Sequence, residues 1–194
     1  MKMGTIEVIC GPMFAGKTEE LLRRVRRLEY AKKKVVLFKP QIDDRYEKAF
    51  IVSHNQNKAL CVSIYKAEEM FEFVKEDTDA VVIDEFQFLG DEAVDVVLYF
   101  VRKGKRVILS GLDKDFRGEP FTNMPRILAY ADDVTKLTAI CVKCGEPATC
   151  TQRIINGKPA NYNDPQILVG ASESYEARCA TCHEVPGRIY KYDK

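Results

Sequence analysis

The chain has 194 residues, of which 46% are hydrophobic and 10% aromatic, so it can bury a full core and is not a disordered polypeptide. Its 30 lysines and arginines nearly balance its 29 aspartates and glutamates, and the net charge of +1 disfavours binding to nucleic acid or to an anionic membrane surface. No apolar run has the length of a membrane span and no signal-peptide core precedes the first strand, so we expect a cytoplasmic protein without nucleic-acid or membrane partners.

The first predicted strand, residues 5–10, leads into a loop that matches the phosphate-binding pattern G-x-x-x-x-G-K-[ST]. Glycines let backbone N–H groups converge on phosphate oxygens at the positive end of a helix. Lys17 adds a charge toward the β- and γ-phosphates, and Thr18 offers a hydroxyl to Mg²⁺. An ordinary glycine-rich turn is the alternative, but an amphipathic helix is predicted from the loop to about residue 31, which completes the context of a nucleoside triphosphate site. The loop consists of Gly11, Pro12, Met13, Phe14, Ala15, Gly16, Lys17 and Thr18.

Apolar strands and helices alternate along the rest of the chain up to about residue 140. A polar stretch without a clear period, residues 41–58, reads as a mobile loop. Continuous apolar strands separated by helices are typical of a parallel sheet with helices on both faces, which predicts an α/β fold of the P-loop, RecA-like type. The predicted strands are 35–38, 60–64, 81–83 and 107–109, and the predicted helices after the first are 67–75 and 91–103.

Two acidic residues, Asp84 and Glu85, end the apolar strand at residues 81–83. In phosphate-loop proteins an acidic residue at such a strand end helps to hold the Mg²⁺ shell, and Asp84 fits that role. Glu85 would project at the carboxyl end of the sheet, where it can accept a proton from an attacking hydroxyl or water. The alternative is a pair of solvent-facing acids at a strand end.

Two C-x-x-C pairs lie near the end of the chain and together supply the four thiolates of a tetrahedral structural Zn²⁺ site. Disulfides are one alternative, and the cytosolic setting and the paired spacing disfavour them. A thioredoxin-like redox pair is the other, and neither C-x-x-C opens a helix in a βαβ unit, as such a pair would. His183 could replace its neighbour as a ligand, although adjacent residues seldom both fit one tetrahedron. We therefore expect a P-loop nucleotide-binding domain at residues 1–140 and a small zinc-binding subdomain at residues 141–194. The predicted ligands are Cys141, Cys144, Cys179 and Cys182.

Two classes of function fit these motifs. One is a small-molecule kinase, and the other is an ATPase motor or switch that grips nucleic acid through its zinc module. The chain is short and electrically balanced, and a long excursion between the cysteine pairs could fold over an acceptor as a lid. These features favour a kinase without naming its acceptor.

The chain resembles the zinc-containing type of thymidine kinase over nearly its whole length. The resemblance rests on the phosphate loop, on the two cysteine pairs and on short motifs in the family's order. Two departures from the family pattern are small: Ala15 stands where serine is common, and Phe86 stands where a smaller residue is usual. The short motifs are Lys39-Pro40 with Asp44-Arg45-Tyr46, Asp84-Glu85-Phe86-Gln87-Phe88, Gly111-Leu112-Asp113 with Phe116 and Pro120-Phe121, and Val169-Gly170-Ala171 with Tyr175.

The resemblance implies that ATP phosphorylates thymidine on its 5′-hydroxyl to give thymidine monophosphate in nucleotide salvage. Glu85 is then the general base, Asp84 joins Lys17 and Thr18 in handling phosphates and Mg²⁺, and Phe86 and Gln87 belong to the ATP site. Arg45 is a candidate phosphate clamp, although a lone basic residue in a loop could equally be a surface charge.

The resemblance also implies a lasso-like loop, between the zinc pairs, that closes over the nucleoside. Without the resemblance, most of the apolar residues that it assigns to the pocket would be assigned to the core, and that alternative stays open for Leu112. The family is typically a homotetramer that thymidine triphosphate inhibits, so the same partners are expected here. The implied nucleoside-binding residues are Met13, Phe88, Leu112, Phe116, Phe121, Thr151, Val169 and Tyr175.

Overall fold

A six-stranded sheet forms the centre of the computed structural model, which describes residues 2–41, 50–52, 58–167 and 173–192. All neighbouring strands of this sheet run parallel. Their order across the sheet is β5 (Val62–Ile64), β2 (Val35–Pro40), β6 (Ala80–Ile83), β7 (Arg106–Gly111), β1 (Ile6–Cys10) and β8 (Asp133–Lys136). The predicted α/β fold with a parallel sheet is confirmed.

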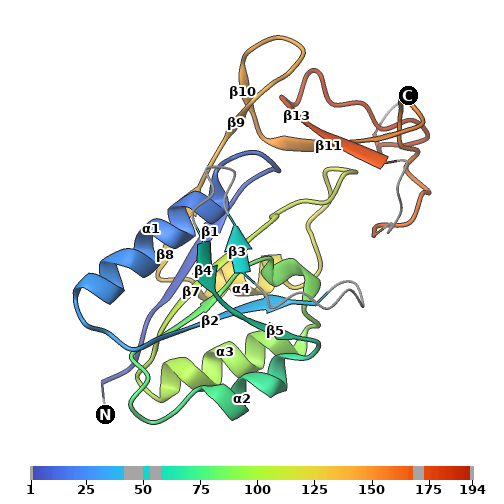
Figure 1. Ribbon diagram of the computed structural model, residues 1–194. Helices are drawn as coiled ribbons and strands as arrows, with labels where there is room; N and C mark the ends of the chain where they lie inside the picture. The colour runs from blue at the N-terminus through green and yellow to red at the C-terminus, as the bar shows by residue number, and fades with distance from the viewer. Residues whose placement is uncertain (1, 42–49, 53–57, 168–172, 193–194) are drawn as a thin grey trace.

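Helices cover both faces of the sheet (Figure 1). Helix α1 (Lys17–Tyr30) lies on one face. The other face packs against α2 (Met70–Phe73), which follows the 3₁₀ turn η1 (Ala67–Glu69), and against α3 (Glu92–Arg102) and α4 (Met124–Tyr130). None of the helices in the described ranges is long and apolar enough to cross a membrane.

The central strands are apolar on both sides because each side supports a separate core. Val82 and Ile108 contribute to the cluster under α1, whereas Val81 and Val107 contribute to the cluster under α3 and α4. Successive side chains of a strand point to opposite faces, so an uninterrupted apolar run is what a sheet covered on both sides requires.

Three described segments differ from the sequence-based expectations. Phe50–Val52 forms β3 and pairs with β4 (Lys58–Leu60), although we expected a loop over residues 41–58. Helix α4 and strand β8 were not predicted. Strand β8 lies at the edge of the sheet and is mostly exposed, so it lacks the apolar run that revealed the central strands.

The carboxyl-terminal part of the chain forms small antiparallel sheets apart from the main one (Figure 1). Strands β9 (Ala139–Ile140) and β10 (Pro147–Ala148) form a hairpin. Strand β11 (Cys150–Ile155) pairs with β12 (Lys158–Pro159) and with β13 (Glu173–Arg178). The division into domains at residues 1–140 and 141–194 stays a prediction.

Candidate active site

The phosphate loop joins the carboxyl end of β1 to the first turn of α1. Gly16 adopts a left-handed backbone conformation with φ of 80° at the start of the helix. A Cβ atom on Gly11 would lie 2.3 Å from the carbonyl oxygen of Leu137, so only glycine fits there. Both glycines of the motif are therefore required by the backbone, and the loop has the shape in which N–H groups can surround a phosphate.

Lys17 is a buried cation at this loop, with only 8% of its surface exposed. Its Nζ donates to the carbonyl oxygen of Pro12 at 2.8 Å, and no carboxylate lies within ion-pair distance of it among the described residues. Burial lowers the pKa of Lys17, while the charges of Glu85 and Asp84 oppose that shift. A triphosphate would give this buried ammonium the anionic partner that the described residues do not supply, so the loop fits ATP.

Thr18 and Asp84 bring two kinds of oxygen together beside the loop. Thr18 Oγ1 lies 3.4 Å from Asp84 Oδ2, and Ser110 at the end of β7 donates to Asp84 Oδ1. Burial and then the charge of Glu85 raise the pKa of Asp84 to about 6. Hydroxyl and carboxylate oxygens are the ligands that Mg²⁺ prefers, and a cation would offset the buried charge, so this pair fits the predicted magnesium site.

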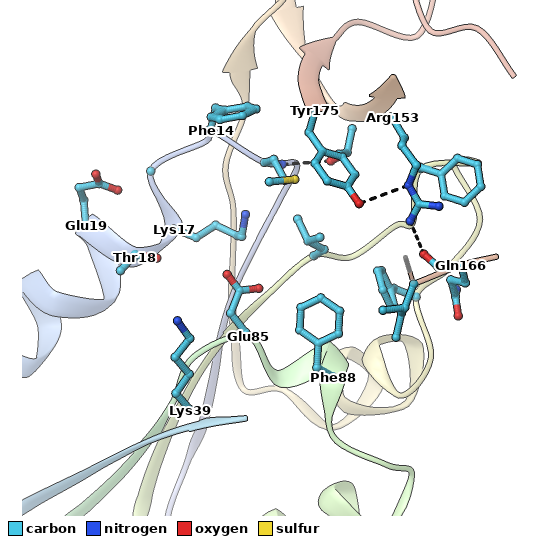
Figure 2. A pocket seen from close by; sticks show the side chains of 17 residues that line it. Phe14, Lys17, Thr18, Glu19, Lys39, Glu85, Phe88, Arg153, Gln166 and Tyr175 are labelled. Carbon is cyan, nitrogen blue, oxygen red and sulfur yellow. Dashed lines mark hydrogen bonds between the residues drawn. The ribbon is translucent and has the colours of Figure 1, made fainter. Parts of the chain in front are cut away.

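Glu85 stands in a strained turn directly after β6 and Asp84. Its φ of 52° lies in the left-handed region, which costs a residue other than glycine about 1–3 kcal/mol. The turn continues as the 3₁₀ segment η2 (Phe86–Phe88). The side chain of Glu85 lines the same cavity as Lys17 and Thr18 (Figure 2).

This cavity has a volume of about 380 Å³, within the range of small-molecule sites. Figure 2 shows the side chains of Lys17, Lys39 and Glu85 at one end, and those of Tyr175, Arg153 and Gln166 at the other. The first end is polar and charged, and the second is largely aromatic. Its lining residues are Met13, Phe14, Gly16, Lys17, Thr18, Glu19, Lys39, Glu85, Phe88, Leu112, Phe116, Phe121, Thr151, Arg153, Gln166, Ile167 and Tyr175.

Strand β11 and the segment after β12 contribute the wall that faces the phosphate loop. Thr151 Oγ1 accepts a hydrogen bond from the backbone N–H of Met13 at 3.0 Å, which ties β11 directly to the loop. The guanidinium of Arg153 lies 4.1 Å from the ring centroid of Phe116. It also donates to Tyr175 Oη at 3.2 Å and to the carbonyl oxygens of Pro165 and Gln166, each at 2.5 Å. Arg153 thus holds the segment around residue 165 against the aromatic end of the cavity.

The four predicted zinc ligands come together in one cluster, in which all the Sγ atoms lie within 4.8 Å of one another. Cys144 and Cys179 have their Sγ atoms 3.6 Å apart, close to the roughly 3.8 Å edge of a tetrahedron with 2.3 Å Zn–S bonds. Burial raises the pKa of Cys141, but backbone hydrogen bonds, chiefly from Cys179, outweigh it and lower the pKa to about 6. The geometry of the four sulfur atoms therefore fits zinc, whereas His183 Nε2 lies 2.8 Å from the carbonyl oxygen of Phe116 and stands outside the cluster.

The structure brings most of the predicted site residues to this cavity. Asp84, Phe86 and Gln87 lie behind the wall and are buried, so they do not line it. Arg45 and Val169 lie outside the described residues. Of the predicted nucleoside-binding residues, those that line the cavity are Met13, Phe88, Leu112, Phe116, Phe121, Thr151 and Tyr175.

Sequence reasoning missed Lys39, Arg153, Gln166, Ile167 and Glu19 as lining residues. Lys39 ends β2 at the same edge of the sheet as the phosphate loop, and the rule that ligands bind at the carboxyl ends of parallel strands could have found it. Arg153 had no such signal, because a lone arginine in a short strand usually reads as a surface charge.

A parallel sheet with a phosphate loop after β1, an acidic pair after β6 and an adjoining apolar pocket defines the class of P-loop kinases that act on small molecules. The family model described as thymidine kinase matches residues 4–183. The chain therefore belongs to the thymidine kinase family and has the ATP-dependent kinase function of that family. The cluster of four cysteines fits the zinc-containing type, as the resemblance implied.

Proposed function

We propose that the chain transfers the γ-phosphoryl group of ATP to the 5′-hydroxyl of thymidine with Glu85 as the general base. The oxygen of the hydroxyl forms a bond to the γ-phosphorus while the bond from that phosphorus to the leaving ADP oxygen breaks. Glu85 accepts the hydroxyl proton. The observation that carries this assignment is the position of the Glu85 carboxylate, in one cavity with Lys17 and with the apolar residues Phe88 and Leu112.

The phosphate end of the cavity would hold the triphosphate through the loop backbone and Lys17. Thr18 and Asp84 would hold Mg²⁺, which when bound neutralises charge on the β- and γ-phosphates. Lys39 lines the same end and has no hydrogen-bond or ion-pair partner among the described residues, so we assign it to the transferred phosphoryl group. Arg45 remains a proposed phosphate clamp outside the described residues.

The aromatic end would hold the thymine base and the sugar. Phe88 and Phe121 meet edge to face with their ring centroids 5.7 Å apart and form one wall. Tyr175 and Arg153 would close the opposite side together with the segment at residues 161–167 and the proposed contact at Val169. Backbone groups of this segment can pair with the N3–H and the carbonyls of thymine.

Three further properties follow from the family and remain part of the proposal. These are a homotetrameric assembly, inhibition by thymidine triphosphate and a cytoplasmic location. Thymidine triphosphate carries both the base that the aromatic end would bind and the phosphates that the loop would bind. It could therefore occupy both ends of the cavity at once.

The test of this proposal is the variant Glu85→Gln, which keeps the size of the side chain but cannot accept a proton. Loss of a general base typically lowers the rate by ~10²–10⁴-fold, so we expect a fall of that size in the single-turnover rate with thymidine binding nearly unchanged. Rapid-quench measurement with radiolabelled ATP and calorimetric titration of thymidine give the two quantities. A rate within a few-fold of the parent would exclude Glu85 as the base.

A further inference from the structure

Gln87 is buried directly behind Glu85, with 1% of its surface exposed, and it does not line the cavity. Its Nε2 donates to Glu85 Oε2 at 2.6 Å. Its Oε1 accepts from the backbone N–H of Leu112 at 3.0 Å. The side-chain amide therefore bridges the Glu85 carboxylate and the start of the segment that carries Leu112 into the pocket wall.

These two contacts fix which end of the amide faces Glu85. A backbone N–H can only donate, so the oxygen of the Gln87 amide must face Leu112. The NH₂ group, which can only donate, must then face the carboxylate of Glu85. The donor therefore holds Glu85 Oε2 in one place and fixes the plane of the carboxylate.

Neighbouring residues make room for the bridge and hold its turn in place. A Cβ atom on Gly111 would lie 2.6 Å from Gln87 Oε1, so glycine at this position admits the amide. Thr122 Oγ1 donates to the carbonyl oxygen of Gln87 at 2.7 Å. Asn123, fully buried, donates to the carbonyl oxygens of Phe86 and Leu89 at 3.2 and 2.8 Å.

The bridge occupies one oxygen of Glu85 and leaves the other for substrate. None of the described residues donates a hydrogen bond to Glu85 Oε1. The charged groups that face this carboxylate are Asp84, which precedes it, Lys17 on α1, and Lys39 at the end of β2. All three stay in place when only Gln87 is changed, so a change in the single-turnover rate would report the bridge.

We propose that Gln87 is a positioning residue, which holds the Glu85 carboxylate oriented relative to the nucleoside wall at Leu112, rather than a residue that contacts ATP. The inference rests on the proposed role of Glu85 as general base. It replaces the expectation that Gln87 belongs to the nucleotide site with a role that acts through Glu85.

Two variants test it. Gln87→Met keeps the size of the side chain and removes the donor, so we expect the single-turnover rate to fall by about tenfold or more, as for loss of a hydrogen bond to a charged group. The KM values for ATP and thymidine should stay within a few-fold of the parent. A residue that only supported the fold would lower the melting temperature without this split between the rate and the KM values.

Gln87→Glu is the second variant, and it keeps an oxygen for the backbone N–H of Leu112. It places a carboxylate where the amide donor stood, so the hydrogen bond to Glu85 Oε2 is lost and like charges push the two side chains apart. The single-turnover rate should therefore fall at least as far as in Gln87→Met. This variant keeps the inference testable even if Gln87→Met fails to fold.

Gln152→Met is the matched control for removal of a buried glutamine. Gln152 is fully buried, donates to the carbonyl oxygen of Glu184 at 2.9 Å and accepts from its N–H at 2.8 Å, far from Glu85 in the sequence. Its loss should lower the melting temperature, and any change that it makes in the rate should be the same in the parent and in Glu85→Gln.

Three results would overturn the inference. A single-turnover rate within a few-fold of the parent in both Gln87 variants would make the residue a support of the turn only. A raised KM for ATP with an unchanged rate would return Gln87 to the nucleotide site. A further rate loss when Gln87→Met is added to Glu85→Gln would show that Gln87 does not act through Glu85.

The Glu85→Gln variant separates this inference from the proposed function. If Glu85→Gln keeps the parental rate, the general base has been assigned wrongly and the proposed function fails first. If Glu85→Gln is inactive while the Gln87 variants keep the parental single-turnover rate, only the role of Gln87 fails.

Discussion

The fold buries Asp84 and Lys17 close enough for their charges to interact, but it does not join them in an ion pair. Burial raises the pKa of Asp84 to about 6 and lowers that of Lys17, so in each case the charged form is disfavoured. Perturbed groups of this kind gather where a charged ligand is to be bound. The strained backbone of Glu85, with φ of 52°, belongs to the same pattern.

The buried charge of Asp84 predicts a pH-dependent effect of the substitution Asp84→Asn in the absence of Mg²⁺. The pKa of Asp84 is about 6 in the folded state, above its ordinary value. Between about pH 4 and 6, Asp84 therefore holds a proton in the folded state that it has released in the unfolded chain. The parent therefore loses stability as the pH rises through this window, whereas an asparagine does not. The melting temperature of Asp84→Asn minus that of the parent should therefore be larger at pH 8 than at pH 5.

Calorimetry at both pH values with a chelator present measures this difference. Adding a large excess of Mg²⁺ and a non-hydrolysable ATP analogue at pH 8 should reduce the advantage of Asp84→Asn, because the cation then compensates the charge in the parent. A difference in melting temperature that is the same at pH 5 and pH 8 would contradict the assigned burial of charge.

At the scale of secondary-structure elements, β11 connects the cluster of four cysteines to the phosphate loop. The hairpin of β9 and β10 holds the first cysteine pair, and the second pair follows β13, which pairs with β11. Thr151 on β11 bonds to the backbone of Met13, and Arg153 on the same strand holds the segment near residue 165. The cluster thereby fixes the ends of the segment that lines the aromatic end of the cavity.

Zinc should be present at one equivalent per chain, and Cys182→Ser should reduce that content. Removal of a ligand loosens the strands attached to the cluster, whereas the main sheet has its own two cores. We therefore expect faster hydrogen exchange in β11 and β13 with little change in β1 and β7. Elemental analysis and hydrogen-exchange mass spectrometry measure both effects.

His183→Ala provides the control, because His183 stands next to Cys182 but contacts the carbonyl oxygen of Phe116. Its zinc content should equal that of the parent. Protein purified without chelator that contains no zinc would refute the assignment of the four cysteines.

Thymidine should protect the segment that Arg153 holds. The carbonyl oxygens of Pro165 and Gln166 are bonded to Arg153, and Gln166 and Ile167 line the cavity, so a ligand there would slow exchange of this segment. We expect slower exchange over peptides that cover residues 151–175 when thymidine is added. Unchanged exchange of these peptides at saturating thymidine would contradict the proposed nucleoside site.

At the scale of the whole molecule, the main sheet and the carboxyl-terminal strands both contribute walls to one cavity. The sheet supplies the phosphate end through the carboxyl ends of β1, β2 and β6, and the carboxyl-terminal strands supply much of the aromatic end. The first end suits any nucleoside triphosphate, so discrimination among acceptors must come from the second.

A panel of nucleosides tests this division of roles. Thymidine presents N3–H as a donor, whereas deoxycytidine presents N3 as an acceptor and an amino group at C4. A site built for one pattern leaves its own polar groups unpaired with the other, a penalty that reaches 10⁴–10⁵-fold in favourable cases. We expect ATP-dependent monophosphate formation from thymidine at a kcat/KM at least about a hundredfold above that for deoxycytidine.

Purine deoxynucleosides in the same panel should be poorer substrates still, because a cavity of about 380 Å³ must hold base, sugar and phosphate together. The rate of ATP hydrolysis without a nucleoside is the control for a motor or switch. Equal rates with thymidine and deoxycytidine would contradict the proposed source of specificity.

The sequence by itself determined the sheet, the phosphate loop and the cluster of four cysteines, because each depends on local constraints. Continuous apolar strands between helices require a sheet covered on both faces, Gly11 and Gly16 are required by backbone geometry, and the C-x-x-C spacing brings two thiolates of each pair together. The edge strand β8 and the short helix α4 escaped prediction because exposure and brevity remove the periodic signal.

Only the tertiary structure decided how Glu85 is held and which residues line the cavity. The contacts of Gln87 with Leu112, of Thr151 with Met13, and of Arg153 with Tyr175 join residues from different elements, and they span 25, 138 and 22 positions. No local pattern encodes such pairings, because they depend on where the packing of sheet, helices and cysteine cluster places each backbone.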